Sequence, residues 1–203
     1  VVQFEPSKSE GGSPDGHLLP RQSRLRARLP AQEQTACEFR TAHDVQIWPL
    51  RLSEVRLTAA PPDLPISGFR WGAPVRGALR LTFETTNHVD VASIKLDSLP
   101  IFINGAADTA SKLQELLHTQ CIGMLVHAGG LPIRNLTPYP PEALQPEGFT
   151  TDQALLPVES RAFDGHRLLH EYFAFPYRFR FFSVNDLQRS LRGISGSKFE
   201  VVI

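Results

Sequence analysis

The sequence predicts an α+β fold that is mostly β, with sandwich-like antiparallel strands in the first half. The second half is expected to form a smaller unit, in which two amphipathic helices pack on short strands. Apolar and polar residues alternate through much of residues 1–105, Gly- and Pro-rich clusters separate these runs, and helical periodicity is confined to the second half. We therefore expect a β-rich domain at 1–105 and an α+β domain at 106–203.

The alternating runs identify the expected strands and their buried faces. An apolar side chain at every second position marks a strand with one face in the core. The runs comprise Leu25, Ala27 and Leu29; Val55 and Leu57; Leu79, Leu81 and Phe83; and Leu99, Ile101 and Ile103. Arg24, Arg26 and Arg28 alternate with the first run, and we interpret them as a solvated face or a charged seam against a protein.

The chain opens with Val1-Val2-Gln3-Phe4-Glu5, a pattern typical of a strand already in progress. It has no initiator Met, so we expect a piece of a longer protein.

The first helix is expected from Asp108, as its N-cap, to about Gln120. A short buried strand should follow at residues 121–126. The helix has one apolar face at 3.6-residue spacing, formed by Ala110, Leu113, Leu116 and Leu117.

The second helix opens at Asp164-Gly165 and ends before Pro176, because a residue preceding proline is disfavoured in the α conformation. Its apolar stripe comprises Leu168, Leu169, Tyr172 and Phe173. Aromatic residues crowd this region, and we expect most of them in the core, so that Phe173→Ala would destabilise the fold by about 3–5 kcal/mol. There are more aromatic faces than one small core needs, so some are expected to reach a partner. The crowded residues are Phe163, Tyr172, Phe173, Phe175, Tyr177, Phe179, Phe181 and Phe182.

Five prolines occur in residues 132–148, and this predicts an extended surface connector. Proline fixes φ and removes a backbone donor, so regular structure is not expected there. The five are Pro132, Pro138, Pro140, Pro141 and Pro146.

The composition argues against several function classes. Basic and acidic residues number 21 each, so the chain lacks the net positive charge typical of nucleic-acid or anionic-membrane binding. No apolar run reaches the roughly 18 residues of a membrane span. Cys37 and Cys121 are too few for a disulfide framework, and we interpret both as reduced, buried and inert thiols of a cytosolic protein.

No residue pattern predicts a catalytic, cofactor or metal site. His166 and His170 are four apart on the second helix, a spacing that can bind zinc. However, Arg167 stands where the metalloprotease motif needs glutamate, and Glu171 lies outside the pair. No third ligand is evident, so we interpret both histidines as flanking residues of an amphipathic helix.

Several segments resemble the TssF (VasA/ImpG) family of type VI secretion baseplate subunits. The first is Cys37-Glu38-Phe39-Arg40-Thr41 followed by Trp48-Pro49-Leu50. The most specific runs from Gly165 through Arg167-Leu168-Leu169 to Glu171-Tyr172-Phe173-Ala174-Phe175-Pro176. The signature positions taken from this resemblance are Phe39, Trp48, Pro49, Gly165, Leu168, Leu169, Glu171, Tyr172, Phe173, Phe175 and Pro176.

The resemblance implies a structural, non-enzymatic role and covers essentially the whole chain, as the middle part of a longer subunit. Two TssF copies and one TssG would form a wedge that meets TssK, TssE and the spike hub. The wedge would lie in the cytoplasm, docked at the inner membrane. The resemblance implies no cofactor, no nucleic acid, no membrane insertion and no small-molecule substrate.

A carbohydrate-binding module or glycan-acting enzyme with a β-sandwich fold is the alternative. The strand-rich first half with Trp48 and Trp71 would be consistent with it. A sugar site would need exposed aromatic rings near acidic residues in a groove. Loss of glycan binding on Trp71→Ala would support this alternative.

Overall fold

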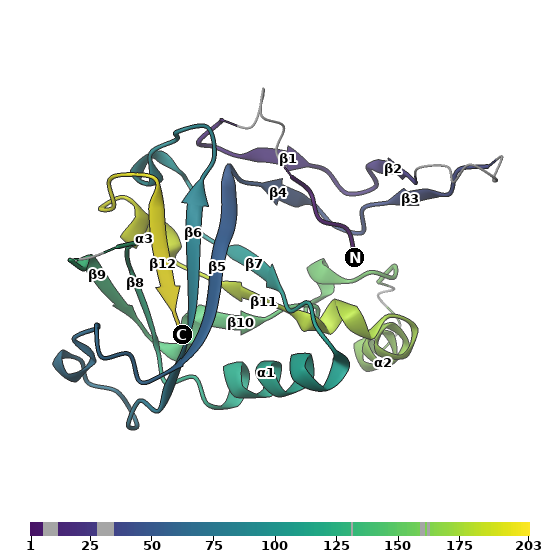
Figure 1. Cartoon of the computed structure of the whole chain (residues 1–203). Coiled ribbons are helices and arrows are strands. Elements are labelled where there is room, and N and C mark those ends of the chain that lie inside the picture. The colour runs from purple at the N-terminus through teal and green to yellow at the C-terminus, as the bar shows by residue number, and fades with distance from the viewer. Residues whose placement is uncertain (6–11, 28–34, 131, 159–160, 162) are drawn as a thin grey trace.

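The structure, a computed structural model, describes residues 1–5, 12–27, 35–130, 132–158, 161 and 163–203. Most of the regular structure is β, with three α-helices and short 3₁₀ turns in the described part, which confirms the predicted fold class (Figure 1). The helices are α1 (Ala107–Thr119), α2 (Asp164–Ala174) and α3 (Leu187–Leu191). The 3₁₀ turns are η1 (Ile66–Gly68), η2 (Val91–Ser93), η3 (Pro141–Ala143), η4 (Thr151–Gln153) and η5 (Pro176–Arg180).

A five-stranded antiparallel sheet forms the main body, in the order β5-β6-β12-β8-β9. Its central strand, β12, is the last element of the chain and pairs with β6 on one side and β8 on the other. The sheet thus combines strands from both expected domains. The division at residue 105 stays a prediction. The strands are β5 (Leu50–Ala59), β6 (Gly77–Thr85), β8 (Met124–Ala128), β9 (Arg134–Tyr139) and β12 (Lys198–Val202).

A second antiparallel sheet, in the order β10-β11-β7, shares its core with the first. Phe83 on β6 and Phe199 on β12 stack with their ring centroids 5.0 Å apart, and Phe182 on β11 joins the same buried cluster. Helix α1 contributes Ala110 and Leu117. The second sheet is formed by β7 (Leu99–Phe102), β10 (Leu144–Pro146) and β11 (Phe181–Val184).

The opposite face of the five-stranded sheet carries a charge network in which Glu200 is buried and Arg80 is partly buried. Arg80 on β6 donates to both Glu200 oxygens on β12, at 2.5 and 3.2 Å, and also to the Asp63 carboxylate at 2.8 Å. The hydrogen bonds that Arg80 donates to Glu200, and then those that it donates to Asp63, raise the pKa of Arg80. His127 on β8 lies next to Glu200, with Nε2 3.5 Å from the carboxylate. The network therefore connects three neighbouring strands to the loop that follows β5.

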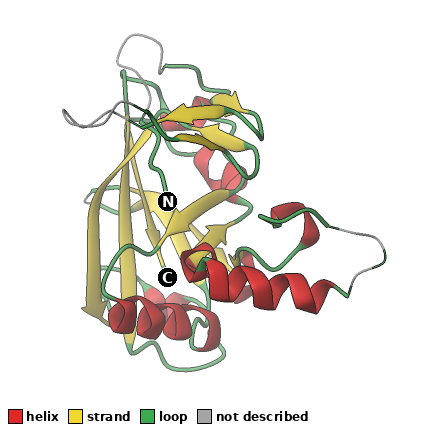
Figure 2. Ribbon diagram, turned by 90° about the vertical axis from the view of Figure 1, so that its right-hand side faces the viewer, coloured by secondary structure: helices red, strands yellow, loops and turns green. Residues whose placement is uncertain are grey.

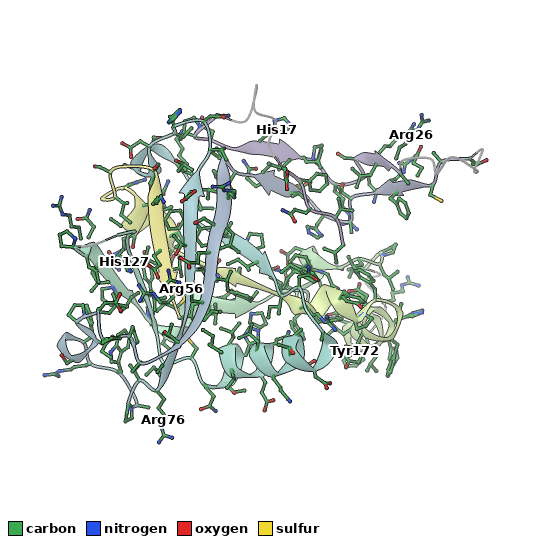
Figure 3. All side chains as sticks on the ribbon, viewed as in Figure 1. His17, Arg26, Arg56, Arg76, His127 and Tyr172 are labelled. Carbon is green, nitrogen blue, oxygen red and sulfur yellow. The ribbon has the colours of Figure 1, made fainter. Side chains whose placement is uncertain are left out.

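Two short ribbons form an arm that projects from the body (Figure 1). Strand β1 (His17–Leu19) pairs with β4 (Val45–Ile47), and β2 (Arg24–Arg26) pairs with β3 (Glu38–Arg40). Between the ribbons, the buried Thr41 hydroxyl accepts from the Ser23 backbone N–H at 3.0 Å and donates to the Pro20 carbonyl at 2.9 Å. Figure 3 shows Arg26 far out on this arm.

The proline-rich segment is regular, contrary to the prediction. Strands β9 and β10 both lie within residues 132–148, separated by η3. Both are edge strands of their sheets. Proline is tolerated at an edge because its missing N–H can be one that would face outward rather than pair with a neighbour. Pro138 and Pro146 therefore restrict these strands to the edges without preventing them.

Several local expectations need correction. Ala106, not Asp108, is the N-cap of α1, and Asp108 instead lies in the first turn, where a carboxylate favours the helix dipole. Cys37 is exposed on the arm because both faces of that narrow ribbon meet solvent. Cys121 is only partly buried, and this burial raises the pKa of its thiol.

The remaining expectations divide between confirmed and corrected ones. The buried run Leu79, Leu81 and Phe83 is confirmed. Val55 and Leu57 are instead 54% and 71% exposed, because β5 is the outer strand and no described segment covers them. Residues 1–5 form no strand. Arg28 and Leu29 lie outside the described residues.

A matched pair of phenylalanines tests where the core lies. Phe199→Ala should lower the free energy of unfolding by about 3–5 kcal/mol, because the ring is fully buried against Phe83. Phe173→Ala should change it by less than about 0.5 kcal/mol, because that ring is 80% exposed. Urea unfolding followed by circular dichroism measures both. Equal losses in the two variants would contradict this assignment of the core.

Candidate protein-binding site

Helix α2 projects from the side of the two sheets (Figure 2). The backbone of Phe163 is extended just before it, and Phe175 leaves the helical conformation at its end. Pro176 then begins η5, consistent with the expected stop before this proline. Gly165 lies in the first turn against the Phe163 ring, and a side chain there would collide with that ring.

The inner side of α2 is polar. Arg167 and Glu171, one turn apart, are 9% and 2% exposed. Arg167 Nη1 donates to Glu171 Oε2 at 3.1 Å, and its Nε and Nη2 donate to Asp164 at 2.7 and 3.0 Å. The hydrogen bonds from Arg167 lower the pKa of the Asp164 carboxyl. Three ionised side chains therefore form one network along the buried side of the helix.

The Glu171 carboxylate also anchors the loop that precedes α2. Its Oε1 accepts the backbone N–H groups of Leu155 and Leu156, at 2.9 and 3.0 Å. Arg167 Nη2 donates to the Phe149 carbonyl at 3.3 Å. A buried charge is tolerated only when paired and hydrogen-bonded, and every oxygen of Glu171 has such a partner. These bonds determine which side of α2 faces the protein.

A second buried arginine supports the same loop from η5. Arg178 is 4% exposed and donates to the Gln153 carbonyl from Nη2 at 3.2 Å. Its Nη2 lies 3.8 Å from Glu147. Burial lowers the pKa of Arg178, and the nearby Glu147 and Glu171 carboxylates oppose this shift.

The outer side of α2 and its flanks is aromatic and exposed. The rings form two contact pairs: Tyr172 lies 5.5 Å from Phe173 between centroids, and Phe175 lies 5.8 Å from Tyr177. Arg180 stacks over Tyr177 at 4.5 Å. Figure 3 places Tyr172 at the α2 end of the molecule, away from the five-stranded sheet. The α2 aromatic patch comprises Phe163, Leu169, Tyr172, Phe173, Phe175 and Tyr177, with exposed fractions from 37% to 80%.

The prediction that most of these aromatic residues belong to the core is therefore wrong. Only Phe179 and Phe182 of the eight are buried, and Phe181 is half-buried. The strong effect expected of Phe173→Ala is contradicted by the exposure of its ring. The helix is amphipathic as predicted, but its polar side faces inward because Glu171 and Arg167 satisfy one another and the preceding loop there. Large contiguous apolar surfaces of this kind mark sites of protein association.

Comparison with known proteins identifies the family. Residues 1–203 match the family described as "Type VI secretion system, TssF". The chain belongs to the TssF family. It is 35% identical, over 205 aligned positions, to "Type VI secretion system component TssF1" of Pseudomonas aeruginosa, and the match covers 100% of this chain and 32% of that protein.

A chain of a solved type VI secretion structure has a similar fold. A chain of the structure described as the "type VI secretion system TssK-TssF-TssG baseplate subcomplex" superposes with a TM-score of 0.71 and 25% identity. The match covers 93% of this chain and 33% of that chain. The present chain thus spans about a third of the length of both of these relatives.

The positions that the resemblance predicts as a TssF signature lie in three environments in the structure. Pro49 and Glu171 are buried, and Trp48, Gly165 and Leu168 are partly buried. Trp48 packs against the main core. The exposed positions are Phe39, Leu169, Tyr172, Phe173, Phe175 and Pro176. Of these, Leu169, Tyr172, Phe173 and Phe175 meet in the α2 aromatic patch, whereas Phe39 lies apart on β3.

The structure also locates the residues considered for other chemistry. His166 and His170 lie at the exposed side of α2, and the described residues contain no cluster of three potential metal ligands. Trp71 Nε1 donates to the Ile66 carbonyl at 2.9 Å, and its ring packs against Phe69. No described helix is long and apolar enough to cross a membrane.

Sequence reasoning missed the buried pair Arg167–Glu171. Their i, i+4 spacing was visible in the sequence, and such pairs usually lie on the solvated side of a helix. The burial of this pair depends on the loop at 147–156. Backbone groups of this loop, 15–18 residues earlier in the sequence, form hydrogen bonds with Glu171 and Arg167.

Removing the anchoring carboxylate should be costly. Glu171→Ala should lower the free energy of unfolding by about 3–5 kcal/mol, because it leaves Arg167 buried with one partner fewer and frees the N–H groups of Leu155 and Leu156. Glu115→Ala, on the exposed side of α1, is the control and should change it by less than about 0.5 kcal/mol. Chemical denaturation measures both variants. A Glu171→Ala protein as stable as the control would show that the network does not position the helix.

Proposed function

We propose that this chain is a structural, non-enzymatic part of a type VI secretion baseplate subunit, and that the α2 aromatic patch binds another baseplate protein. The observation that supports this most directly is the polarity of α2. The helix buries a charge network and exposes its aromatic residues. Apolar surface exposed to water is unfavourable, and a bound partner would cover it. Aromatic residues on a rigid helix are effective binding anchors, because they bury large areas and lose little conformational entropy.

TssG and TssK are the first partners to test. A structural relative of this chain was solved as a TssK-TssF-TssG subcomplex, and family membership supports extending that assembly to the present chain. A second TssF copy, TssE and the spike hub are further proposed partners, which rest on the family resemblance. The proposed location is the cytoplasm, within a baseplate docked at the inner membrane.

A non-enzymatic role is consistent with how the buried ionisable groups are used. Glu171 accepts a backbone N–H group, and Arg167 and Arg178 donate to backbone carbonyls. The hydrogen bond from Arg80 to Glu200 connects two strands. Each of these groups has a structural partner. The carbohydrate-binding alternative is not favoured, since Trp48 packs on the core and Trp71 is engaged by Phe69 and Ile66.

Truncating the patch should weaken partner binding without unfolding the chain. Phe173→Ala and Tyr172→Ala should each reduce affinity for TssG, or for the TssG–TssK pair, by about 2 kcal/mol, roughly 30-fold in Kd. Both rings are more than half exposed, so the fold should remain intact. Co-purification and titration calorimetry with TssG and TssK of the same bacterium provide the measurement.

Leu116→Ala is the matched control, because Leu116 is 51% exposed on α1, outside the patch. It should leave binding unchanged. If the patch variants bound TssG and TssK as tightly as the wild type did, the α2 aromatic patch would not be their binding surface. Glucan or chitin binding by the folded chain would instead support the carbohydrate alternative.

A further inference from the structure

Strand β5 exposes both an unpaired backbone edge and a row of apolar side chains. It is the outer strand of the five-stranded sheet, and no described strand pairs with its free edge. Nearly all its residues are exposed, from Arg51 through Leu57. A ten-residue strand with a free edge is a template for adding another strand.

The apolar row lies on the core side of the sheet. Directly paired residues of an antiparallel sheet project to the same face, and the β6 partners of this row are buried core residues. Leu52 pairs with Phe83, Val55 with Leu81, and Leu57 with Leu79. The register shifts between Leu52 and Glu54, so one extra residue keeps Leu52 on the same face as Val55. The core thus continues onto β5, where the three side chains are 42%, 54% and 71% exposed.

The opposite face of β5 carries Glu54 and Arg56, which have opposite signs, and Arg51, which donates to Glu84 on β6. Glu54 and Arg56 are both exposed, and Arg56 donates to Glu54 at 2.5 and 2.7 Å within the strand. They flank Val55 symmetrically. This spacing makes the strand complementary to itself when a second copy runs antiparallel and is centred on Val55.

We infer that β5 pairs with β5 of a second copy of this chain, in an antiparallel register centred on Val55, to form a continuous sheet across two subunits. In that register Val55 faces the partner's Val55. Glu54 of each copy faces Arg56 of the other, so the dimer contains two such charge pairs. Leu57 of each copy lies beside the partner's Leu52, so the apolar row becomes continuous on one face. Opposite charges and β-branched residues directly across from each other are favourable cross-strand pairs.

The charge pattern is what selects a second copy over an unrelated strand. Any extended segment could satisfy the free edge, but this register matches both charged pairs and the apolar row at once. The inference rests on the proposed function only in naming a second TssF copy as a partner, and the α2 aromatic patch takes no part in it.

A cysteine at the symmetry axis tests the register. In a Cys37→Ser, Cys121→Ala background, Val55→Cys should form an intermolecular disulfide under mild oxidation, because residues facing each other in an antiparallel pair lie within disulfide range. Leu57→Cys is the matched control. Its symmetry mate would lie four positions along the partner strand, about 13 Å away. Equal cross-linking of the two variants, or none by Val55→Cys, would overturn the inference.

Charge reversal tests the pairing without cross-linking. Glu54→Arg and Arg56→Glu, each made in the wild-type chain, should weaken dimerisation by about tenfold or more relative to wild type. Symmetry would place two like-charged pairs in each variant dimer. A 1:1 mixture of the two variants should form heterodimers, because each brings the charge that the other lacks. Sedimentation velocity at several concentrations measures all three samples, with circular dichroism to confirm folding.

The mixture also separates this inference from a simple effect on the strand itself. Mixing cannot restore the Glu54–Arg56 contact within one strand, so recovery must come from contacts between copies. A wild-type chain that stays monomeric at every concentration, or a mixture no more dimeric than its components, would overturn the inference. Loss of TssG binding in the Phe173→Ala variant would be unaffected by either result, so this inference and the proposed function can fail separately.

Discussion

The buried carboxylate of Glu171 holds helix α2 in the orientation that exposes the α2 aromatic patch. It pairs with Arg167 and accepts two backbone N–H groups from the loop before α2. These partners offset the several kcal/mol that burying the charge would otherwise cost, and they hold the polar side of the helix against the protein. The aromatic side must then face outward. The hydrogen-bonded Glu171 carboxylate therefore favours an orientation of α2 opposite to the one that hydrophobicity alone would favour.

The five-stranded sheet likewise has a buried part and an exposed apolar part. Its centre is covered on one face by the second sheet and α1. On the other face, Leu64 of the loop after β5 packs with sheet residues Ala78, Leu125 and Val202, and Asp63 of the same loop accepts from Arg80. Strand β5 lies beyond this cover and exposes the continuation of the core row. Both exposed apolar surfaces thus arise where the packing of the described residues ends, which is consistent with the proposed structural role.

Membership of the TssF family gives these surfaces a setting. The chain spans about a third of its relatives, and one relative was solved within a TssK-TssF-TssG subcomplex. The proposed scaffold role would need rigid elements that position the contact residues. Here α2 is fixed by Glu171, Arg167 and the loop they bind, while β5 is fixed by pairing along its whole length with β6. The two surfaces are separate in sequence and carry different chemistry, so they can serve different neighbours.

The sequence by itself determined the fold class, the buried run of Leu79, Leu81 and Phe83, the approximate positions of α1 and α2, and the family resemblance. These follow from local periodicity, from the stop before Pro176 and from specific motifs, all of which are encoded in consecutive residues. Tertiary structure alone decided which side of α2 is buried, that Pro138 and Pro146 lie in edge strands, and that Val55 and Leu57 remain exposed. Each depends on residues distant in sequence. The loop before α2 provides hydrogen-bond partners for Glu171, β9 and β10 each have a described neighbouring strand on one side only, and no described strand lies beyond β5. Periodicity identifies an apolar face, but only the packed neighbours determine whether that face becomes core or surface.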